Sequence, residues 1–207
     1  MPKEANFSNI YKVYDLVNTV LTLGFDKSWR TKASKYIIGN HVLDLGSGTG
    51  AAYKQLENFN VIALDPDEKM LQLNNFSTKI TANAENIPLD DNSIDTVYCA
   101  FVWRNVYDTQ KALSEVKRVL RPNGVFILLD MTRPKNKILR VIHRIGTLIT
   151  TTLIGFLTLN IRDYRFLHTS LDKYEQPEVN FKQHPFNSIE IKRMGLFGFV
   201  YLTIFKK

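Results

Sequence analysis

Three glycines alternate with small polar residues at Gly46, Gly48 and Gly50, directly after the apolar run Val42–Leu45. Glycine lets the backbone turn sharply and approach a ligand closely, and the N–H groups of a following helix attract an anionic group. Asp65 ends the next apolar run, which is where doubly wound folds place a carboxylate for the hydroxyls of a ribose. The spacing therefore predicts a site for a nucleoside-containing ligand.

Asp44 distinguishes two such ligands. Dinucleotide sites use the spacing G-x-G-x-x-G and bind a pyrophosphate on the N–H groups of the loop. This chain has G-x-G-x-G preceded by Asp44, and a carboxylate beside the loop repels a pyrophosphate but attracts an ammonium or sulfonium group. S-adenosylmethionine (SAM) carries both cationic groups together with adenosine, so the loop favours SAM. A glycine-rich turn without a ligand is the alternative.

An amide side chain follows the third apolar run at Asn83. An amide offers a donor and an acceptor together, so it can read the edge of adenine alongside a backbone N–H group. The alternative is that Asn83 is a turn residue.

The composition is that of a soluble globular domain: 207 residues, 44% hydrophobic and 23% charged. These values exclude wholesale disorder and a polytopic membrane protein. Cys99 is the single cysteine, which excludes an intrachain disulfide and favours a reducing, cytoplasmic location. The four histidines lack the spacing of zinc ligands, so no metal is expected. The first residues lack the apolar core of a secretory signal peptide.

The net charge of +7 lies in the last third of the chain, where residues 134–207 hold 12 Lys and Arg against 5 Asp and Glu. A one-sided positive field is typical of a protein with an anionic partner, and a solvated basic surface is the alternative. Basic residues also flank the uncharged run Ile145–Ile161. The run is short and rich in threonine for a membrane span, so we expect a buried helix pair or an interfacial lid in peripheral contact with an anionic membrane.

The elements that position these residues follow from apolar runs that alternate with helical stretches. Strands are expected at His41–Leu45, Asn60–Leu64, Lys79–Ala82, Ile94–Cys99 and Val125–Asp130. Helices are expected at Asp67–Asn74 and at Thr109–Leu120, the latter with Asp108 as its N-cap. The tail segments Phe186–Met194 and Phe199–Lys206 are typical of an antiparallel hairpin.

The N-terminal region has helical periodicity. Ile10, Tyr14, Val17 and Leu21 fall on one helix face that ends near Gly24. A second helix is expected to start with Asp26 as its cap and to place Trp29, Ala33 and Ile37 on one side.

These elements predict an α/β fold with a Rossmann-like, doubly wound sheet of about seven strands, mostly parallel, with the antiparallel hairpin at its end. We expect a single domain over residues 1–207. Its parts are N-terminal helices (1–40), a SAM-binding core (41–133), a helical lid or substrate region (134–180) and C-terminal strands (181–207).

Four segments resemble class I SAM-dependent methyltransferases: VLDLGSGTG at 42–50, ALDPDEKML at 63–71, ANAENIPLDDNSID at 82–95 and KALSEVKRVLRPNG at 111–124. More narrowly, Trp103–Asp108 resembles the L-R-N-V-x-D segment of the UbiE/MenG family. The N-terminal stretch from Phe7 to Arg30 and the segment Tyr164–Ser170 are also similar to that family. The family C-methylates demethylated precursors of menaquinone or ubiquinone.

The resemblance implies methyl transfer from SAM to a ring carbon of a demethylmenaquinol-like quinol. Another small hydrophobic or phenolic acceptor is the alternative, and a non-catalytic SAM-binding scaffold is a further one. The residues expected to bind SAM are Asp44, Gly46, Ser47, Gly48, Thr49, Asp65, Pro66, Asn83, Ala84 and Ala100. The basic tail lacks a [DN]-P-P-[YFW] tetrapeptide for a flipped base, so no nucleic-acid partner is expected. The oligomeric state stays open, with a homodimer as one alternative.

Arg104 is the candidate catalytic residue. A quinol carbon becomes nucleophilic when a neighbouring hydroxyl ionises, and a phenol titrates near 10, so a stabilising charge is needed. Arg104 can hold the developing phenolate or orient a water, and a salt bridge to Asp108 is the alternative. The candidate proton acceptors are His143, His168, Tyr14 and Tyr164.

Four features depart from the family pattern, one of which is the conservative replacement of a Gly-Gly turn by Asn123-Gly124. Ala100 stands where the family often has serine, which removes a hydroxyl contact. Val102-Trp103 replaces a Gly-Leu pair and is expected to add bulk beside the reaction site. Residues 172–185 contain Pro177 and Pro185 and lack helical periodicity, whereas the family carries a helix there.

Overall fold

The computed structural model describes residue 22, residues 24–157 and residues 168–207. The helix predicted from Ile10, Tyr14, Val17 and Leu21 lies outside the described residues. So do the candidate proton acceptors Tyr14 and Tyr164.

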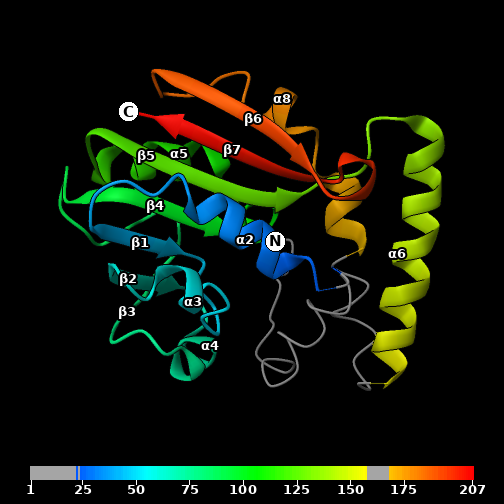
Figure 1. Ribbon diagram of the computed structural model, residues 1–207, viewed down its shortest axis with the longest axis horizontal. Helices are drawn as coiled ribbons and strands as arrows, with labels where there is room; N and C mark the ends of the chain where they lie inside the picture. The colour runs from blue at the N-terminus through cyan, green and yellow to red at the C-terminus, as the bar shows by residue number, and fades with distance from the viewer. Residues whose placement is uncertain (1–21, 23, 158–167) are drawn as a thin grey trace.

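Seven strands form one sheet in the order β3-β2-β1-β4-β5-β7-β6 (Figure 1). Strands β1 to β5 pair in parallel, β7 pairs antiparallel with β5, and β6 pairs antiparallel with β7. The predicted mostly parallel sheet with an antiparallel C-terminal hairpin is therefore confirmed. The strands are β1 His41–Leu45, β2 Asn60–Asp65, β3 Thr78–Thr81, β4 Ile94–Ala100, β5 Leu120–Met131, β6 Ser188–Met194 and β7 Val200–Lys206.

The strand order reverses between β1 and β4, which are neighbours in the sheet although two strands separate them in the chain. At such a switch point the connections leave the two strands in opposite directions, which opens a crevice at their carboxyl ends. The glycine loop follows β1, and the turn that carries Arg104 follows β4. The topology thus brings both features to the same edge of the sheet.

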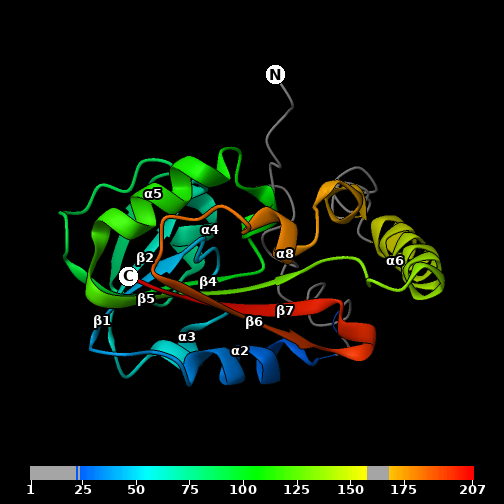
Figure 2. The ribbon, with the colours of Figure 1, turned by 90° about the horizontal axis from the view of Figure 1, so that it is seen from above.

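Helices cover both faces of the sheet, with α2 and α3 on one face and α5 on the other (Figure 2). Alternate strand residues point to the two faces, so Val42 and Tyr98 join one buried cluster while Leu43 and Val97 join the other. The helices are α2 Asp26–Ser34, α3 Tyr53–Leu56, α4 Glu68–Leu73, α5 Thr109–Val119, α6 Lys137–Leu157 and α8 Pro177–Asn180, with 3₁₀ turns η2 Trp103–Asn105 and η3 Leu196–Gly198. Residues 168–173 are also helical.

The predicted helix caps are confirmed in one case and corrected in another. The Asp108 carboxylate accepts a hydrogen bond from the N–H of Lys111 and caps α5. Asp26 is instead the first residue of α2, with Phe25 at the N-cap. The Asp26 carboxylate accepts a hydrogen bond from Thr22 Oγ1, which places it beside the entering chain.

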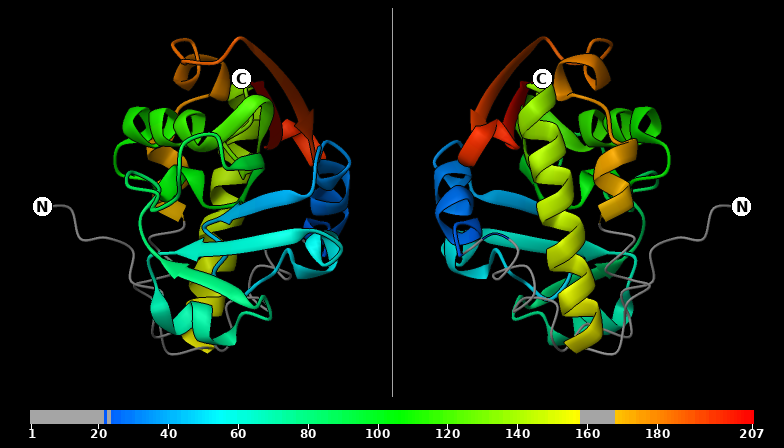
Figure 3. Two further views of the ribbon diagram at one scale, coloured as in Figure 1. Left: turned by 90° about the vertical axis from the view of Figure 1, so that its left-hand side faces the viewer. Right: turned by 90° about the vertical axis from the view of Figure 1, so that its right-hand side faces the viewer.

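Two expectations for the lid region change. A one-turn helix, α8, does form within 172–185, and Pro177 occupies its first turn, where the missing N–H costs nothing. Residues 145–157 of the apolar run belong to one 21-residue helix, α6, which starts at Lys137 and stands across the carboxyl end of the sheet (Figure 3), and the rest of the run lies outside the described residues. No helix in the described ranges is long and apolar enough to cross a membrane.

Trp103 belongs to the core. Its side chain is fully buried and packs on Phe126 with ring centroids 5.2 Å apart, in the cluster shared with α5. Of this residue pair, Val102 is the one that lies against the glycine loop, because the Trp103 ring lies among core side chains.

Replacing Trp103 with alanine should lower the free energy of unfolding by ~3–5 kcal/mol, because it leaves a large cavity. Denaturant-induced unfolding followed by circular dichroism measures the loss. Tyr107→Ala is the matched control, since that ring is 83% exposed, and it should change stability by less than ~0.5 kcal/mol. Equal effects of the two variants would contradict the packing described.

Candidate functional site

The glycine loop, residues 46–50, has left-handed backbone at Gly46, Gly48 and Gly50. A Cβ atom added to Gly46 would lie 2.5 Å from the Val102 side chain, and one added to Gly50 would lie 2.9 Å from Asn74. Both positions therefore require glycine for steric as well as conformational reasons. At Gly48 the nearest atom to such a Cβ is 3.9 Å away, so the backbone there is open to close approach by a ligand.

Asp65 ends β2 and lies beside this loop. Its Oδ2 accepts a hydrogen bond from the N–H of Gly48 at 2.9 Å, and its Oδ1 accepts one from the N–H of Asp67 at 2.9 Å. These bonds fix the carboxylate and leave further lone pairs on both oxygens for ligand hydroxyls. Burial nevertheless raises the pKa of Asp65 to about 6, although the two backbone hydrogen bonds act in the opposite direction.

Asp44 is the second buried carboxylate. It is 3% exposed, and its Oδ2 accepts a hydrogen bond from Ser47 Oγ at 2.5 Å. Burial raises the pKa of Asp44 to about 6, the nearby Arg30 charge lowers it, and the Asp65 charge raises it. Both folded-state pKa values exceed the unfolded value. The two protonated carboxyl groups therefore stabilise the folded protein fully below about pH 4, and this stabilisation is lost as the pH rises through about 6.

Asn74, just after α4, connects the loop to that helix. Its Nδ2 donates to Ser47 Oγ at 2.8 Å and to the carbonyl oxygen of Gly48 at 3.0 Å, and the residue is 4% exposed. Sequence reasoning missed this role. An asparagine at the end of a helix is common for conformational reasons alone, and nothing in the sequence indicates that it reaches back across 26 residues to the loop.

The other residues predicted to bind SAM lie around this edge of the sheet. The segment after β3 is tied to Asp65, because the N–H of Ala82 donates to the Asp65 carbonyl oxygen at 3.3 Å. Hydrogen bonds thus bring Asp44, Ser47, Gly48 and Asp65 together. Pro66 and Asn83 are exposed, Thr49 and Ala84 are half-buried, and Ala100 is buried at the end of β4.

The side chain of Arg104 is 2% exposed and forms an ion pair with Asp130 of β5. Its Nη1 also donates to the carbonyl oxygen of Phe101 at 3.0 Å, and its own N–H donates to Asp130 Oδ2 at 3.0 Å. The salt-bridge partner is therefore Asp130, whereas Asp108 caps α5. Arg104 thus holds the turn that follows β4.

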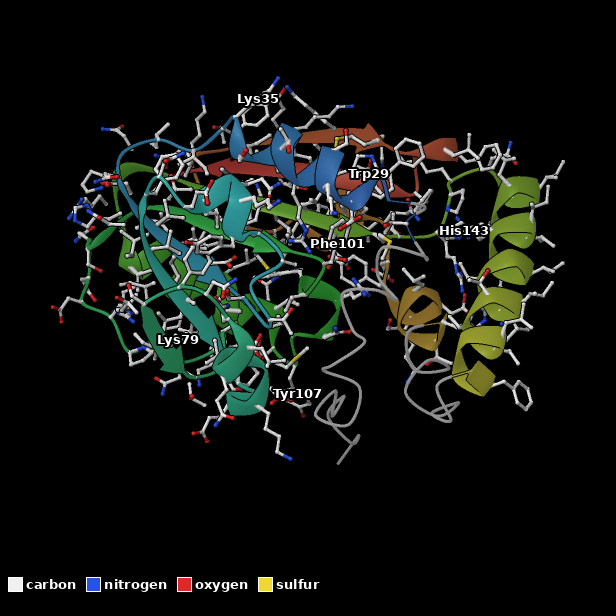
Figure 4. The ribbon with its side chains drawn as sticks, turned by 60° about the horizontal axis from the view of Figure 1, so that its bottom comes forward. Trp29, Lys35, Lys79, Phe101, Tyr107 and His143 are labelled. Carbon is white, nitrogen blue, oxygen red and sulfur yellow. The ribbon has the colours of Figure 1, made fainter. Side chains whose placement is uncertain are left out.

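That turn is strained at Phe101, which adopts φ of +67° although it has a side chain. Its ring packs against Trp29 of α2 with ring centroids 6.4 Å apart, and the Arg30 guanidinium lies 5.0 Å from the ring centroid (Figure 4). Left-handed non-glycine residues persist where surrounding contacts hold them, often beside functional sites. Arg104 and α2 together supply those contacts.

Arg133, just after β5, organises the start of the lid region. Its guanidinium lies 3.2 Å from Nδ1 of His143 and 3.2 Å from Nδ1 of His168, and it donates to Asp172 Oδ1 at 2.8 Å. Burial lowers the pKa of His143 to about 4, and the Arg133 charge acts in the same direction. His143 is therefore neutral at neutral pH, and both candidate histidines serve this cluster.

Known proteins resemble this chain over most of its length. The ubiE/COQ5 methyltransferase family matches residues 3–195. The ubiquinone/menaquinone biosynthesis C-methyltransferase UbiE of Rickettsia felis is 32% identical, over 91% of this chain and 86% of its own length. A demethylmenaquinone methyltransferase of Thermotoga maritima is 30% identical, over 83% of this chain and 81% of its own length.

Solved structures share the fold at low identity. A SAM-dependent methyltransferase from Thermotoga maritima superposes with a TM-score of 0.70 at 17% identity and covers 97% of both chains. Another from Archaeoglobus fulgidus gives 0.65 at 16% identity and covers 94% of this chain and all of its own. The matched length and the identity to the curated relatives show that this chain belongs to the ubiE/COQ5 methyltransferase family.

Proposed function

We propose that this protein transfers the methyl group of SAM to a ring carbon of a demethylated, menaquinol-like quinol. The observation that carries the proposal is the pair of buried carboxylates, Asp44 and Asp65, on either side of the glycine loop at the switch point of the sheet. Family membership supports methyl transfer. The quinol acceptor is inferred from the curated relatives, whose names refer to quinone biosynthesis.

The residues at the carboxyl edge of the sheet offer chemical groups that complement the parts of SAM. The free lone pairs of Asp65 suit the two ribose hydroxyls, and the open backbone at Gly48 permits close approach. Asp44 provides negative charge for the cationic end of the molecule, and Asn83 with Ala84 suits the adenine edge. We assign supporting roles to Gly46, Ser47, Thr49, Pro66 and Ala100, which line or shape the same edge.

Bound SAM supplies a methyl group that its sulfonium already makes electrophilic. The chain must hold the acceptor in line with that group, exclude water and favour the ionised hydroxyl of the quinol. The Arg104 side chain is buried and paired with Asp130. We therefore propose that Arg104 acts on the reaction indirectly, by positioning the turn that carries Phe101 and Val102. The side of α6 that faces the sheet and residues 168–173 are proposed to border the acceptor, because Arg133 anchors both next to the same strand ends.

An acceptor assay tests the reaction. With labelled-methyl SAM, the full chain should methylate a ring carbon of demethylmenaquinol or of a demethylated ubiquinol precursor, and mass spectrometry of the product should locate the methyl group on carbon. Transfer only to an unrelated phenol or amine would replace the quinol by the alternative acceptor class. SAM binding without transfer to any acceptor would favour a non-catalytic scaffold.

SAM affinity should depend on pH. The proposed site needs both carboxylates ionised, and their pKa values of about 6 in the free protein mean that protons must leave before SAM binds. Affinity should be constant above about pH 7 and should fall by about tenfold per pH unit and per carboxylate well below pH 6. Isothermal titration calorimetry between pH 5 and pH 8 measures this.

Asp65→Asn is the matched variant for that titration. It should weaken SAM binding at neutral pH by ~10–100-fold, because it removes a charge-assisted acceptor, and it should reduce the steepness of the pH dependence. An affinity that is flat from pH 5 to pH 8 in the unmodified chain would contradict the role of the carboxylates.

Arg104→Lys should lower kcat on the order of 100-fold, since a small displacement of the turn misaligns the acceptor, while the Kd for SAM stays within about threefold. Lysine keeps the charge opposite Asp130 but lacks the planar fork that also reaches the Phe101 carbonyl. Steady-state kinetics and calorimetry separate the two quantities. Wild-type turnover in this variant and in Arg104→Ala would remove Arg104 from the mechanism.

A further inference from the structure

The apolar side of helix α6 faces away from the rest of the protein. Its large aliphatic and aromatic side chains recur every three or four residues and are 42–72% exposed. At ~1.5 Å per residue the stripe is about 27 Å long. Few soluble proteins leave a continuous apolar stripe of this length in water, and such a patch indicates a partner or a membrane surface. The stripe consists of Ile138, Val141, Ile142, Ile145, Leu148, Ile149, Leu153 and Phe156.

The opposite side of α6 attaches to the protein through polar groups. His143 and Thr147 contact the guanidinium of Arg133, with the Nη1 of Arg133 donating to Thr147 Oγ1 at 2.7 Å. Thr151, one turn later, is 1% exposed. Figure 4 shows His143 on the side of α6 that faces the sheet. This arrangement is the reverse of a surface helix in a soluble domain, whose apolar stripe faces the core. The outward direction of the stripe is therefore imposed by specific contacts.

Basic residues border the stripe along its N-terminal half. Lys137, Arg140 and Arg144 are exposed, and α6 contains no Asp or Glu. Arg144 pairs with Asp172, whereas Lys137 and Arg140 form no ion pair with any residue that the structure describes. Cationic groups in the first turn of a helix oppose its dipole, so this placement does not stabilise α6 itself. It suits an external anionic surface.

We propose that the outer face of α6 binds the surface of an anionic phospholipid bilayer, with the helix axis parallel to the membrane plane. The helix is not suited to cross a membrane, and an apolar stripe with a basic border is the pattern of helices that lie at the headgroup boundary. A second copy of the chain fits this face less well. If two α6 helices packed together, neither would offer an acidic group to Lys137 and Arg140 of the other.

Helix α6 lies at the same end of the molecule as the proposed site. The helix stands beyond the carboxyl ends of β4 and β5 (Figures 1 and 3), the same end of the sheet that carries the glycine loop and Arg104. A bilayer on α6 would therefore lie at the end of the molecule that carries the proposed site. The proposal goes beyond the proposed methyl transfer and does not require it.

Vesicle co-sedimentation of the full chain tests the proposal. The protein should sediment with vesicles of phosphatidylglycerol and phosphatidylcholine, should bind pure phosphatidylcholine much more weakly, and should be released by high salt. Ile145→Asp should weaken binding about tenfold, since it places a charge in the middle of the stripe. Lys137→Glu should weaken it about fivefold or more.

Ile38→Asp and Lys35→Glu are the matched controls, because both side chains are exposed near the amino end of β1, far from α6 (Figure 4 labels Lys35). They should bind vesicles like the unmodified chain. Far-UV circular dichroism and melting temperature verify that every variant is folded. Methylation of a soluble, short-chain quinol analogue should be unchanged in Ile145→Asp, which separates failure of this proposal from failure of the proposed function.

Three results would overturn the membrane contact. One is an unmodified, folded chain that does not sediment with anionic vesicles. Another is a set of α6 variants that bind as well as the two controls. The third is a dimer, seen by analytical ultracentrifugation, that dissociates in Ile145→Asp, since a second copy would then cover the stripe.

Discussion

Two carboxylates that the fold removes from water hold the glycine loop in place. Asp44 and Asp65 lie in neighbouring strands, and each is held by groups of the glycine loop: Ser47 Oγ for Asp44 and the N–H of Gly48 for Asp65. Burial raises both pKa values to about 6, so in the free protein the two charges are costly. The proposed SAM site uses this cost, because a ligand with hydroxyl and cationic groups would relieve it.

The second organising feature is a pair of buried arginines at the ends of β4 and β5. Arg104 pairs with Asp130 and fixes the strained turn at Phe101. Arg133 contacts side chains of α6 and of the helical segment that contains His168 and Asp172. Buried guanidinium groups need several acceptors in a defined geometry. The two residues therefore connect the sheet to the turn and to the lid region with little freedom of orientation.

The Arg133 contacts also explain why α6 presents its apolar side to the outside. The polar residues His143 and Thr147 satisfy the guanidinium, so the stripe through Ile145 must point away from the sheet. Compared with an ordinary amphipathic surface helix, α6 is therefore rotated by about half a turn about its axis, so that its polar side faces the protein and its apolar side faces outward. The methyltransferase fold and the outward stripe are independent features of one chain, and each has its own physical cause.

Local sequence predicted the seven strands in their order along the chain, although β5 starts at Leu120, five residues before the predicted Val125. Strand β1 was predicted with the bounds that it has, His41–Leu45, and the glycine loop and Asp65 followed from spacing alone. These features are local, because apolar runs, turn residues and helix caps act over a few neighbours. The hairpin of β6 and β7 was also predictable. That β7 is the inner strand was decided by the structure, in which it pairs with both β5 and β6 and is buried from Val200 to Phe205.

Tertiary structure decided which distant residues meet. Asn74 donates a hydrogen bond to the glycine loop, and the Trp103 ring lies in the core. Arg104 pairs with Asp130, although Asp108 is nearer in the sequence. The sequence alone determined that α6 has an apolar and a polar side, but only its contacts with Arg133 decided which side faces water. Periodicity describes a helix in isolation, whereas its rotation about its own axis depends on partners far away in the chain.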